Sequence, residues 1–243
     1  MAYPTTKPGI RARIASYRRL LRQEFAEFGR YGDGYGKRWW LFHLYFLLGE
    51  EADVRAYLDW YARMFPDDGG EVGQRLCWAL ILRRFGREDE ALYRFVQAID
   101  ENLPAVAKVV GDSQAPYGMW GEHEEMIREL YEVPSEVVQA ITADERRWLV
   151  ASWHSPAVAA MRHRTIAIGR ALVTTTVREK RVALLNQQRA LIQAFKPADM
   201  PPLSSDASKH SWLSGAPSSA QKRPRRKAAL PTVGSSPAGS RSR

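Results

Sequence analysis

The sequence predicts an all-α protein, and three observations lead to that expectation. Apolar residues recur at intervals of three and four over most of the first 195 positions, which is the period of amphipathic helices. No stretch shows the two-residue alternation of a half-buried strand. After Lys196 the chain carries seven of its fourteen prolines, among many serines and few large apolar residues. We therefore expect a helical domain over 1–196 and a disordered basic tail over 197–243.

The first predicted helix spans about residues 9–28. Its apolar side chains follow the helical period and its arginines lie between them, so one face is expected to be buried (Ile10, Ile14, Tyr17, Leu21 and Phe25). Gly29 suits the end of this helix.

Two further helices are predicted next. The segment 37–49, KRWWLFHLYFLLG, is apolar nearly all round and is expected to be covered on most sides. The segment 51–68 is amphipathic again and stops at Pro66.

Residues 76–104, LCWALILRRFGREDEALYRFVQAIDENLP, resemble a tetratricopeptide repeat. Small residues stand where paired helices of that family approach closely (Ala79, Ala91 and Ala98), Gly86 stands at the turn, and Pro104 closes the unit. Residues 35–68 fit the same pattern more loosely, with Val54 and Tyr61 in place of small residues. The resemblance gives two repeats, at about 35–68 and 71–104, like those of small tetratricopeptide-repeat proteins of bacteria.

This resemblance implies a binding groove, because the first helix of each repeat lines a concave surface that holds a peptide. The aligned positions are Trp39, His43, Phe46 and Leu47 in the first repeat, and Leu76, Leu80, Arg83 and Arg84 in the second. Aromatic anchors beside arginines suit an apolar peptide with an acidic group. The alternative is that the apolar members of this set belong to the core.

The rest of the domain is expected to form a non-repeat helical cap over about 121–195. Helices are predicted for 122–133, 134–153, 156–173 and 176–195, after a helical turn at 105–111 and a loop at 112–121. Pro134 and Pro156 suit first-turn positions of helices.

The glycine-rich stretch GRYGDGYGKR (29–38) raises the question of a phosphate-binding loop. A Walker loop ending at Gly36 and Lys37 needs glycine at position 31 and a hydroxyl residue at position 38, which are Tyr31 and Arg38. We therefore interpret the stretch as a turn between helices, although Lys37 and Arg38 could receive an anionic partner.

Enzymatic and metal sites are not indicated. His123 and Glu124 would need a histidine at position 127 to form a zinc-protease motif, and that residue is Ile127. Cys77 lies in an apolar segment without a nearby histidine, so it is expected to be buried. No cofactor or metal is expected.

The tail holds two candidate docking elements. The first is the basic run KRPRRK, formed by Lys222, Arg223, Arg225, Arg226 and Lys227, which could neutralise phosphates of a nucleic acid. The second is the isolated apolar pair Trp212 and Leu213. An incidental, solvated tail is the alternative in both cases.

The most consistent interpretation is a non-catalytic adaptor that binds a partner protein in the groove. The alternative is a nucleic-acid-associated protein that uses its basic tail, with a helical enzyme third. The first residues lack the apolar run of a signal peptide and no apolar run reaches the roughly 20 residues of a membrane span, so a cytoplasmic location is expected without a membrane partner. The oligomeric state is not predicted.

Overall fold

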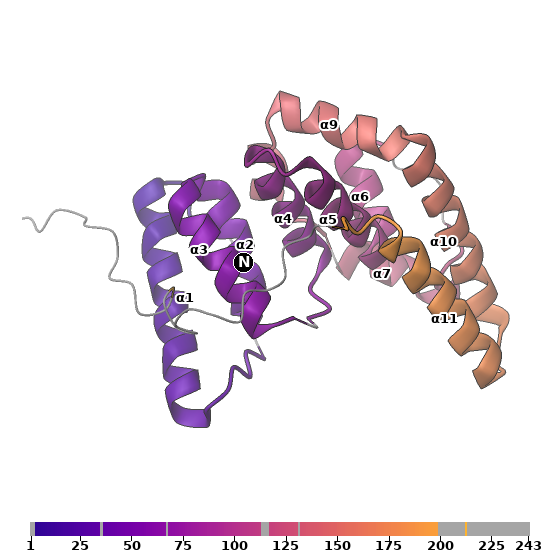
Figure 1. The fold of residues 1–243 in the computed structure, drawn as a ribbon, viewed down its shortest axis with the longest axis horizontal. Coiled ribbons are helices and arrows are strands. Elements are labelled where there is room, and N and C mark those ends of the chain that lie inside the picture. Colours follow the sequence, from indigo (N-terminus) through magenta and orange to yellow (C-terminus); the bar gives the residue numbers. More distant parts are fainter. Residues whose placement is uncertain are drawn as a thin grey trace, which may run out of the picture.

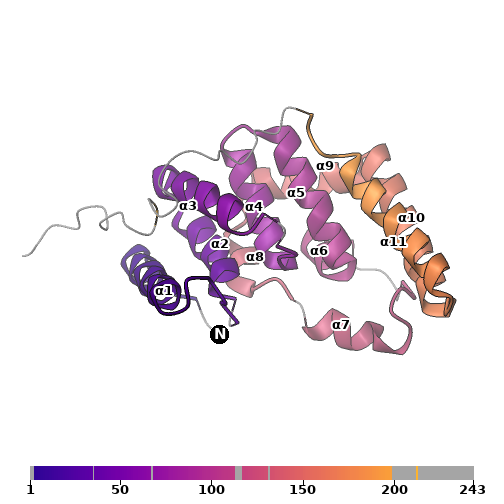
Figure 2. The ribbon, with the colours of Figure 1, turned by 60° about the horizontal axis from the view of Figure 1, so that its bottom comes forward.

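The computed structural model describes residues 3–34, 36–66, 68–112, 117–130, 132–198 and 212. These residues form eleven α-helices, one short 3-10 helix and no strand, so the expected all-α fold is confirmed for the described part of the chain. The helices run as a chain of packed pairs, with α1 at one end and the α10–α11 hairpin at the other (Figures 1 and 2). None of the helices within the described ranges has an apolar stretch long enough to cross a lipid bilayer.

The first group contains α1 (Lys7–Phe28), α2 (Lys37–Leu48) and α3 (Glu51–Met64). The Oγ1 atom of Thr6 accepts the N–H of Gly9 at 3.3 Å and so caps the start of α1. Gly29 ends that helix with a φ of 65°, a left-handed conformation that glycine adopts without a Cβ penalty. The buried face of α1 carries Ile10, Ile14, Tyr17 and Leu21, four of the five residues expected there.

The glycine-rich stretch connects α1 to α2, and its central residue is Asp33. This carboxylate is buried and accepts the backbone N–H groups of Lys37 and Arg38 at 2.9 and 2.8 Å. It also lies 3.3 Å from Lys37 Nζ and 3.2 Å from Arg38 Nη1. The start of α2 therefore receives an anion from its own chain, at the place where Lys37 and Arg38 could have received an anionic partner.

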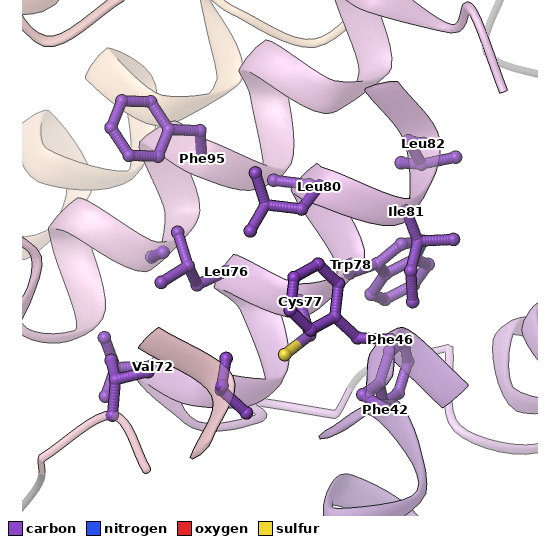
Figure 3. Close-up of a cluster of buried hydrophobic side chains, with 14 of the residues drawn as sticks. Phe42, Phe46, Val72, Leu76, Cys77, Trp78, Leu80, Ile81, Leu82 and Phe95 are labelled. Carbon is purple, nitrogen blue, oxygen red and sulfur yellow. The ribbon is translucent and has the colours of Figure 1, made fainter. Parts of the chain in front are cut away.

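The second group contains α4 (Val72–Arg84) and α5 (Glu88–Glu101), which form the most closely packed helix pair of the described residues. The small residues Ala79, Ala91 and Ala98 are completely buried in it. By contrast, α2 packs mainly against α1 and α4 and only lightly against α3. The core around α4 also takes Phe42 and Phe46 from α2 (Figure 3).

The helices after α5 are shorter and more numerous than expected. They are α6 (Leu103–Val110), the 3-10 turn η1 (Gly121–His123), α7 (Glu124–Leu130), α8 (Ser135–Ala140) and α9 (Ala143–His154). Pro104 lies in the first turn of α6 rather than only closing α5, because Asn102 caps the new helix by accepting the N–H of Ala105. The single helix expected over 134–153 is divided at Ile141, since Thr142 and Glu145 form a reciprocal capping box that starts α9.

The last group is the hairpin of α10 (Pro156–Thr174) and α11 (Arg178–Gln193). It packs against α5, where Gln188 Nε2 donates to Asp100 Oδ1 at 2.6 Å. Ile192 is the buried residue of α11, while Val182 and Leu185 are about half exposed. The hairpin therefore presents much of its surface to solvent.

Candidate functional site

The residues expected to line a groove on α2 and α4 do lie near one another, but most of them are covered. Four of the eight are buried in the core, and Figure 3 shows the three that belong to the apolar cluster around α4. The four are His43, Phe46, Leu76 and Leu80. Trp39 and Leu47 are half-buried. A groove lined by the buried four is not open in this structure.

The start of α9 lies against the two arginines of this face, and its first turn carries the acids that were expected from a partner. Arg84 Nε lies 2.6 Å from Glu145 Oε1, and Arg83 Nη2 lies 2.9 Å from Asp144 Oδ2. Arg84 also donates to the backbone carbonyl of Phe46 at 2.9 Å. The two arginines are thus paired within the chain rather than free to pair with a partner.

The environment of Glu145 favours the charged form of its carboxyl group. Its side chain is 6% exposed. Burial alone would raise the pKa of Glu145, but the hydrogen bond from Arg84 and the bonds from Thr142 outweigh it, so the pKa is lowered. The carboxylate therefore stays charged at neutral pH and holds α9 against α4.

Trp39, another predicted groove residue, has a structural partner as well. Trp39 Nε1 donates to Asp68 Oδ2 at 2.9 Å, and Arg38 Nε donates to the same oxygen at 2.6 Å. These donors, with Tyr61 Oη at 2.8 Å, hold the pKa of Asp68 at about 2 against the opposing effect of burial. Asp68 consequently ties α2 to α3.

His43 connects the N-terminal segment to the core. The Oη atom of Tyr3 lies 2.6 Å from His43 Nδ1, and Glu71 Oε1 lies 3.0 Å from His43 Nε2. A Cβ atom at Gly73 would come within 2.7 Å of that Nε2 atom, so glycine is needed there. Because both ring nitrogens face chain groups inside the core, His43 does not contribute to an open surface.

Another site lies on α1, α2 and α3, and its occupant comes from the C-terminal part of the chain. Trp212 is 4% exposed although the residues on both sides of it lie outside the described ranges. Its indole packs against Tyr45 of α2 and against Tyr57 and Trp60 of α3, with ring centroids 6.3, 5.1 and 4.6 Å away. We call this place the Trp212 slot and define it by Tyr45, Tyr57, Trp60 and Arg18.

Polar contacts fix the orientation of the indole in the slot. Trp212 Nε1 donates to Tyr45 Oη at 2.9 Å. The guanidinium of Arg18 donates to the backbone carbonyl of Trp212, and its Cζ atom lies 4.9 Å from the centroid of the indole. The Trp212 slot therefore recognises the ring, its N–H group and the peptide backbone next to it.

The walls of the Trp212 slot are neutral apart from Arg18. Burial raises the pKa of Tyr45, and it raises the pKa of Tyr57 well above the ordinary value, so both phenols keep their protons. Neutral aromatic walls beside one cation suit an indole, whose ring carries negative potential on its faces.

The sequence pointed to the occupant of the slot but not to its walls. Trp212 was one half of a candidate docking element, for which an incidental tail was the alternative, and Leu213, the other half, lies outside the described residues. The aromatic residues Tyr57, Trp60 and Tyr61 follow helical spacing on α3, and that pattern is equally typical of an ordinary core. The missing information was which segment covers this face.

A separate hollow of about 1160 Å³ lies between α6, α7 and α8. Glutamates line it together with Lys108 and apolar residues, and Glu124 is already committed to the backbone N–H groups of Tyr117 and Met119. Ser135 is the hydroxyl residue of the described lining, and its Oγ atom donates to Glu136 Oε2 at 3.2 Å at the exposed start of α8. Cys77 is elsewhere, completely buried, and burial raises its pKa well above the usual range, which makes it a poor nucleophile.

Charge is strongly segregated along the chain. Residues 51–145 carry nine arginines or lysines and twenty acids, whereas residues 146–198 carry ten basic residues and one acid, Glu179. The basic block corresponds to most of α9 and the α10–α11 hairpin. The five basic residues of 222–227 lie outside the described ranges but extend the same sign of charge along the sequence.

The chain matches no family of known proteins, and neither curated proteins nor solved structures give a significant match. The interpretation of the site therefore depends on the geometry described above.

Proposed function

We propose that this protein is a non-catalytic adaptor that binds a short segment of a partner protein in the Trp212 slot. The observation that carries the proposal is the occupant itself: a tryptophan far away in the sequence is buried there and is held by both its ring and its backbone carbonyl. A site that accepts such a segment from its own chain has the shape and the polar groups to accept one from another chain.

This proposal moves the binding face away from the α2–α4 surface that the repeat resemblance implied. The acids of α9 already satisfy Arg83 and Arg84. The two helix pairs α2–α3 and α4–α5 are still proposed to be tetratricopeptide-like. In this proposal α2 and α3 carry the aromatic walls of the slot, and the α4–α5 pair packs against α2.

The test is capture of a partner from a nuclease-treated lysate with the full-length chain as bait. Trp212→Ala empties the slot and is expected to increase capture. Adding Arg18→Glu should abolish it, because the backbone contact and the cation over the ring are both lost. The matched control is Arg19→Glu, since Arg19 is the exposed neighbour on α1 and should leave capture unchanged. Equal capture by the Arg18 and Arg19 variants would reject the slot as the binding face.

A second candidate function is binding of nucleic acid, and the charge segregation favours it. Ten basic residues against one acid over 146–198, followed by five more over 222–227, give a long positive stretch. Phosphate contacts of this kind weaken steeply as salt rises. Binding of a labelled duplex, measured between 50 and 200 mM salt for the full chain and for a variant with the five tail residues changed to alanine, tests it. Retention that is insensitive to salt would reject this candidate.

A further inference from the structure

We infer that the Trp212 slot is specific for tryptophan, and that Trp212 is a built-in competitor which a tryptophan-bearing segment of the partner must displace. The inference rests on the proposed adaptor function and deepens it in two ways. It names the chemistry of the partner segment, and it makes access to the slot depend on the C-terminal part of the chain.

Specificity for tryptophan follows from the contacts. Tyr45 Oη accepts the indole N–H at 2.9 Å inside a wall that is otherwise aromatic. A phenylalanine would fill part of the same space but would leave that acceptor without its donor. An aliphatic side chain would also lose the contact with the guanidinium of Arg18. The contact from Arg18 to the carbonyl of Trp212 reads the backbone, so the recognised unit is a peptide segment that carries tryptophan.

The walls of the slot hold one another in place without the occupant. Tyr45 and Tyr57 stack at 4.9 Å, and Phe42 packs against Tyr57 at 5.0 Å. The hydroxyl of Tyr57 donates to the backbone carbonyl of Arg38. Because the aromatic walls contact one another across α2 and α3, an incoming segment does not have to build this part of the site, and this lowers the cost of binding.

Competition follows from the tether. Only fourteen residue steps separate Ala198, the last described residue after α11, from Trp212. A segment held by a tether of this length reaches an effective concentration on the order of 1 mM at its site. If a free peptide and the tethered Trp212 both bind the slot with a Kd of about 50 µM, the slot is closed about 20 times as often as it is open, and the apparent Kd of the peptide rises about 20-fold because it equals the intrinsic Kd divided by the open fraction.

The experiment titrates a fluorescein-labelled peptide, residues 206–218 of this chain, into the full-length protein and into its Trp212→Ala variant. We expect binding to the Trp212→Ala variant and at least tenfold weaker binding to the unchanged chain. A peptide with Trp212→Phe is expected to bind the Trp212→Ala protein roughly three- to tenfold more weakly, because it loses one hydrogen bond. A peptide with Trp212→Ala is expected to bind that protein more than about tenfold more weakly, because it loses the whole ring.

A second change isolates the hydrogen bond that gives specificity. In the Trp212→Ala chain, Tyr45→Phe removes the acceptor and leaves the ring wall intact. The difference in affinity between the tryptophan and phenylalanine peptides should then shrink toward onefold. A general loss of structure would lower both affinities together and would not change their ratio.

Each outcome has a definite meaning. Equal binding to the unchanged chain and to the Trp212→Ala variant overturns the claim that Trp212 is a competitor, while the claim that the slot is specific for tryptophan stands. Equal binding of the tryptophan and phenylalanine peptides overturns the specificity. Dimers of the unchanged chain in sedimentation that disappear with Trp212→Ala overturn competition within one chain, because a second copy then supplies the occupant. No binding to the variant overturns the whole inference. The titration needs no partner protein. If the lysate test captures nothing, the adaptor function is rejected, while the titration still tests the specificity of the slot and the competition by Trp212.

Discussion

Glu145→Gln should destabilise the fold far more than the neighbouring change Asp144→Asn. Glu145 is 6% exposed and pairs with Arg84 at 2.6 Å, whereas Asp144 is 64% exposed and pairs with Arg83 at 2.9 Å. Glutamine keeps the length of the side chain and can still take part in the capping box with Thr142, so the change isolates the charge. Breaking a fully buried ion pair costs about 3–5 kcal/mol and breaking an exposed one about 0–1 kcal/mol.

The expected cost of Glu145→Gln lies between these limits, because Arg84 is 31% exposed and can recover part of its hydration. We expect about 2 kcal/mol, which lowers the Tm of a chain of this size by about 4–8 °C, against less than about 2 °C for Asp144→Asn. Thermal unfolding followed by circular dichroism measures both.

The stability difference between the unchanged chain and Glu145→Gln should also depend on pH. The pKa of Glu145 is lowered in the folded protein, so its contribution is present above its ordinary value of 4.5 and is lost as the pH falls through the folded value. The difference between the unchanged chain and Glu145→Gln should therefore shrink in acid. Equal Tm losses for the Glu145 and Asp144 variants at neutral pH would refute the reasoning and would make the α2–α4 face an accessible surface again.

Three further predictions concern the core. Asp33→Ala should cost about 1–2 kcal/mol in urea unfolding, because α2 loses the acceptor of two backbone N–H groups, and Asp33→Asn should cost less since asparagine still caps and tolerates the positive φ of 38°. Asp68→Asn should lower stability at pH 7, an effect that fades as the pH falls from 3.8 through about 2, whereas the exposed Asp59→Asn should change little at either pH. Cys77 should not react with a thiol reagent in the folded protein and should react fully in denaturant; fast reaction in the native state would contradict its complete burial.

The helices could be predicted from the sequence because their signals are local. The period of Ile10, Ile14, Tyr17 and Leu21 places one face of α1 against a core, and Gly29 ends the helix for a reason contained in its own backbone. The division between α8 and α9 was missed although its signal was also local. The pair Thr142 and Glu145 is a capping box that the continuous apolar pattern around it concealed.

The groove could not be predicted in the same way, because an apolar helix face does not say what covers it. Leu76 and Leu80 have the spacing of a lining residue and of a core residue alike. Helix α9, whose acids pair with the two arginines, begins 59 residues after Arg84. No repeat in the sequence relates these acids to the arginines, so the pairing could not be predicted. The Trp212 slot was missed because its aromatic walls have the sequence pattern of ordinary core residues. The sequence does not show that a distant indole packs against them.

The two covered faces differ in whether their covers can leave. Removing α9 would break the Glu145–Arg84 pair and would also return the buried Leu149 and Trp153 to water, a cost of several kcal/mol that no short peptide offsets. Releasing Trp212 strands no charge. It returns roughly 200 Å² of mostly apolar surface to water, a loss of about 5 kcal/mol, and it frees the side chain and the backbone of Trp212, which together regain about 3 kcal/mol of conformational entropy. The balance is about 2 kcal/mol, the same size as the 20-fold competition argued above. Under the proposed competition, a face closed by about 2 kcal/mol is closed most of the time and is still accessible to a partner of micromolar affinity, which makes the α1–α3 side the better candidate for reversible binding.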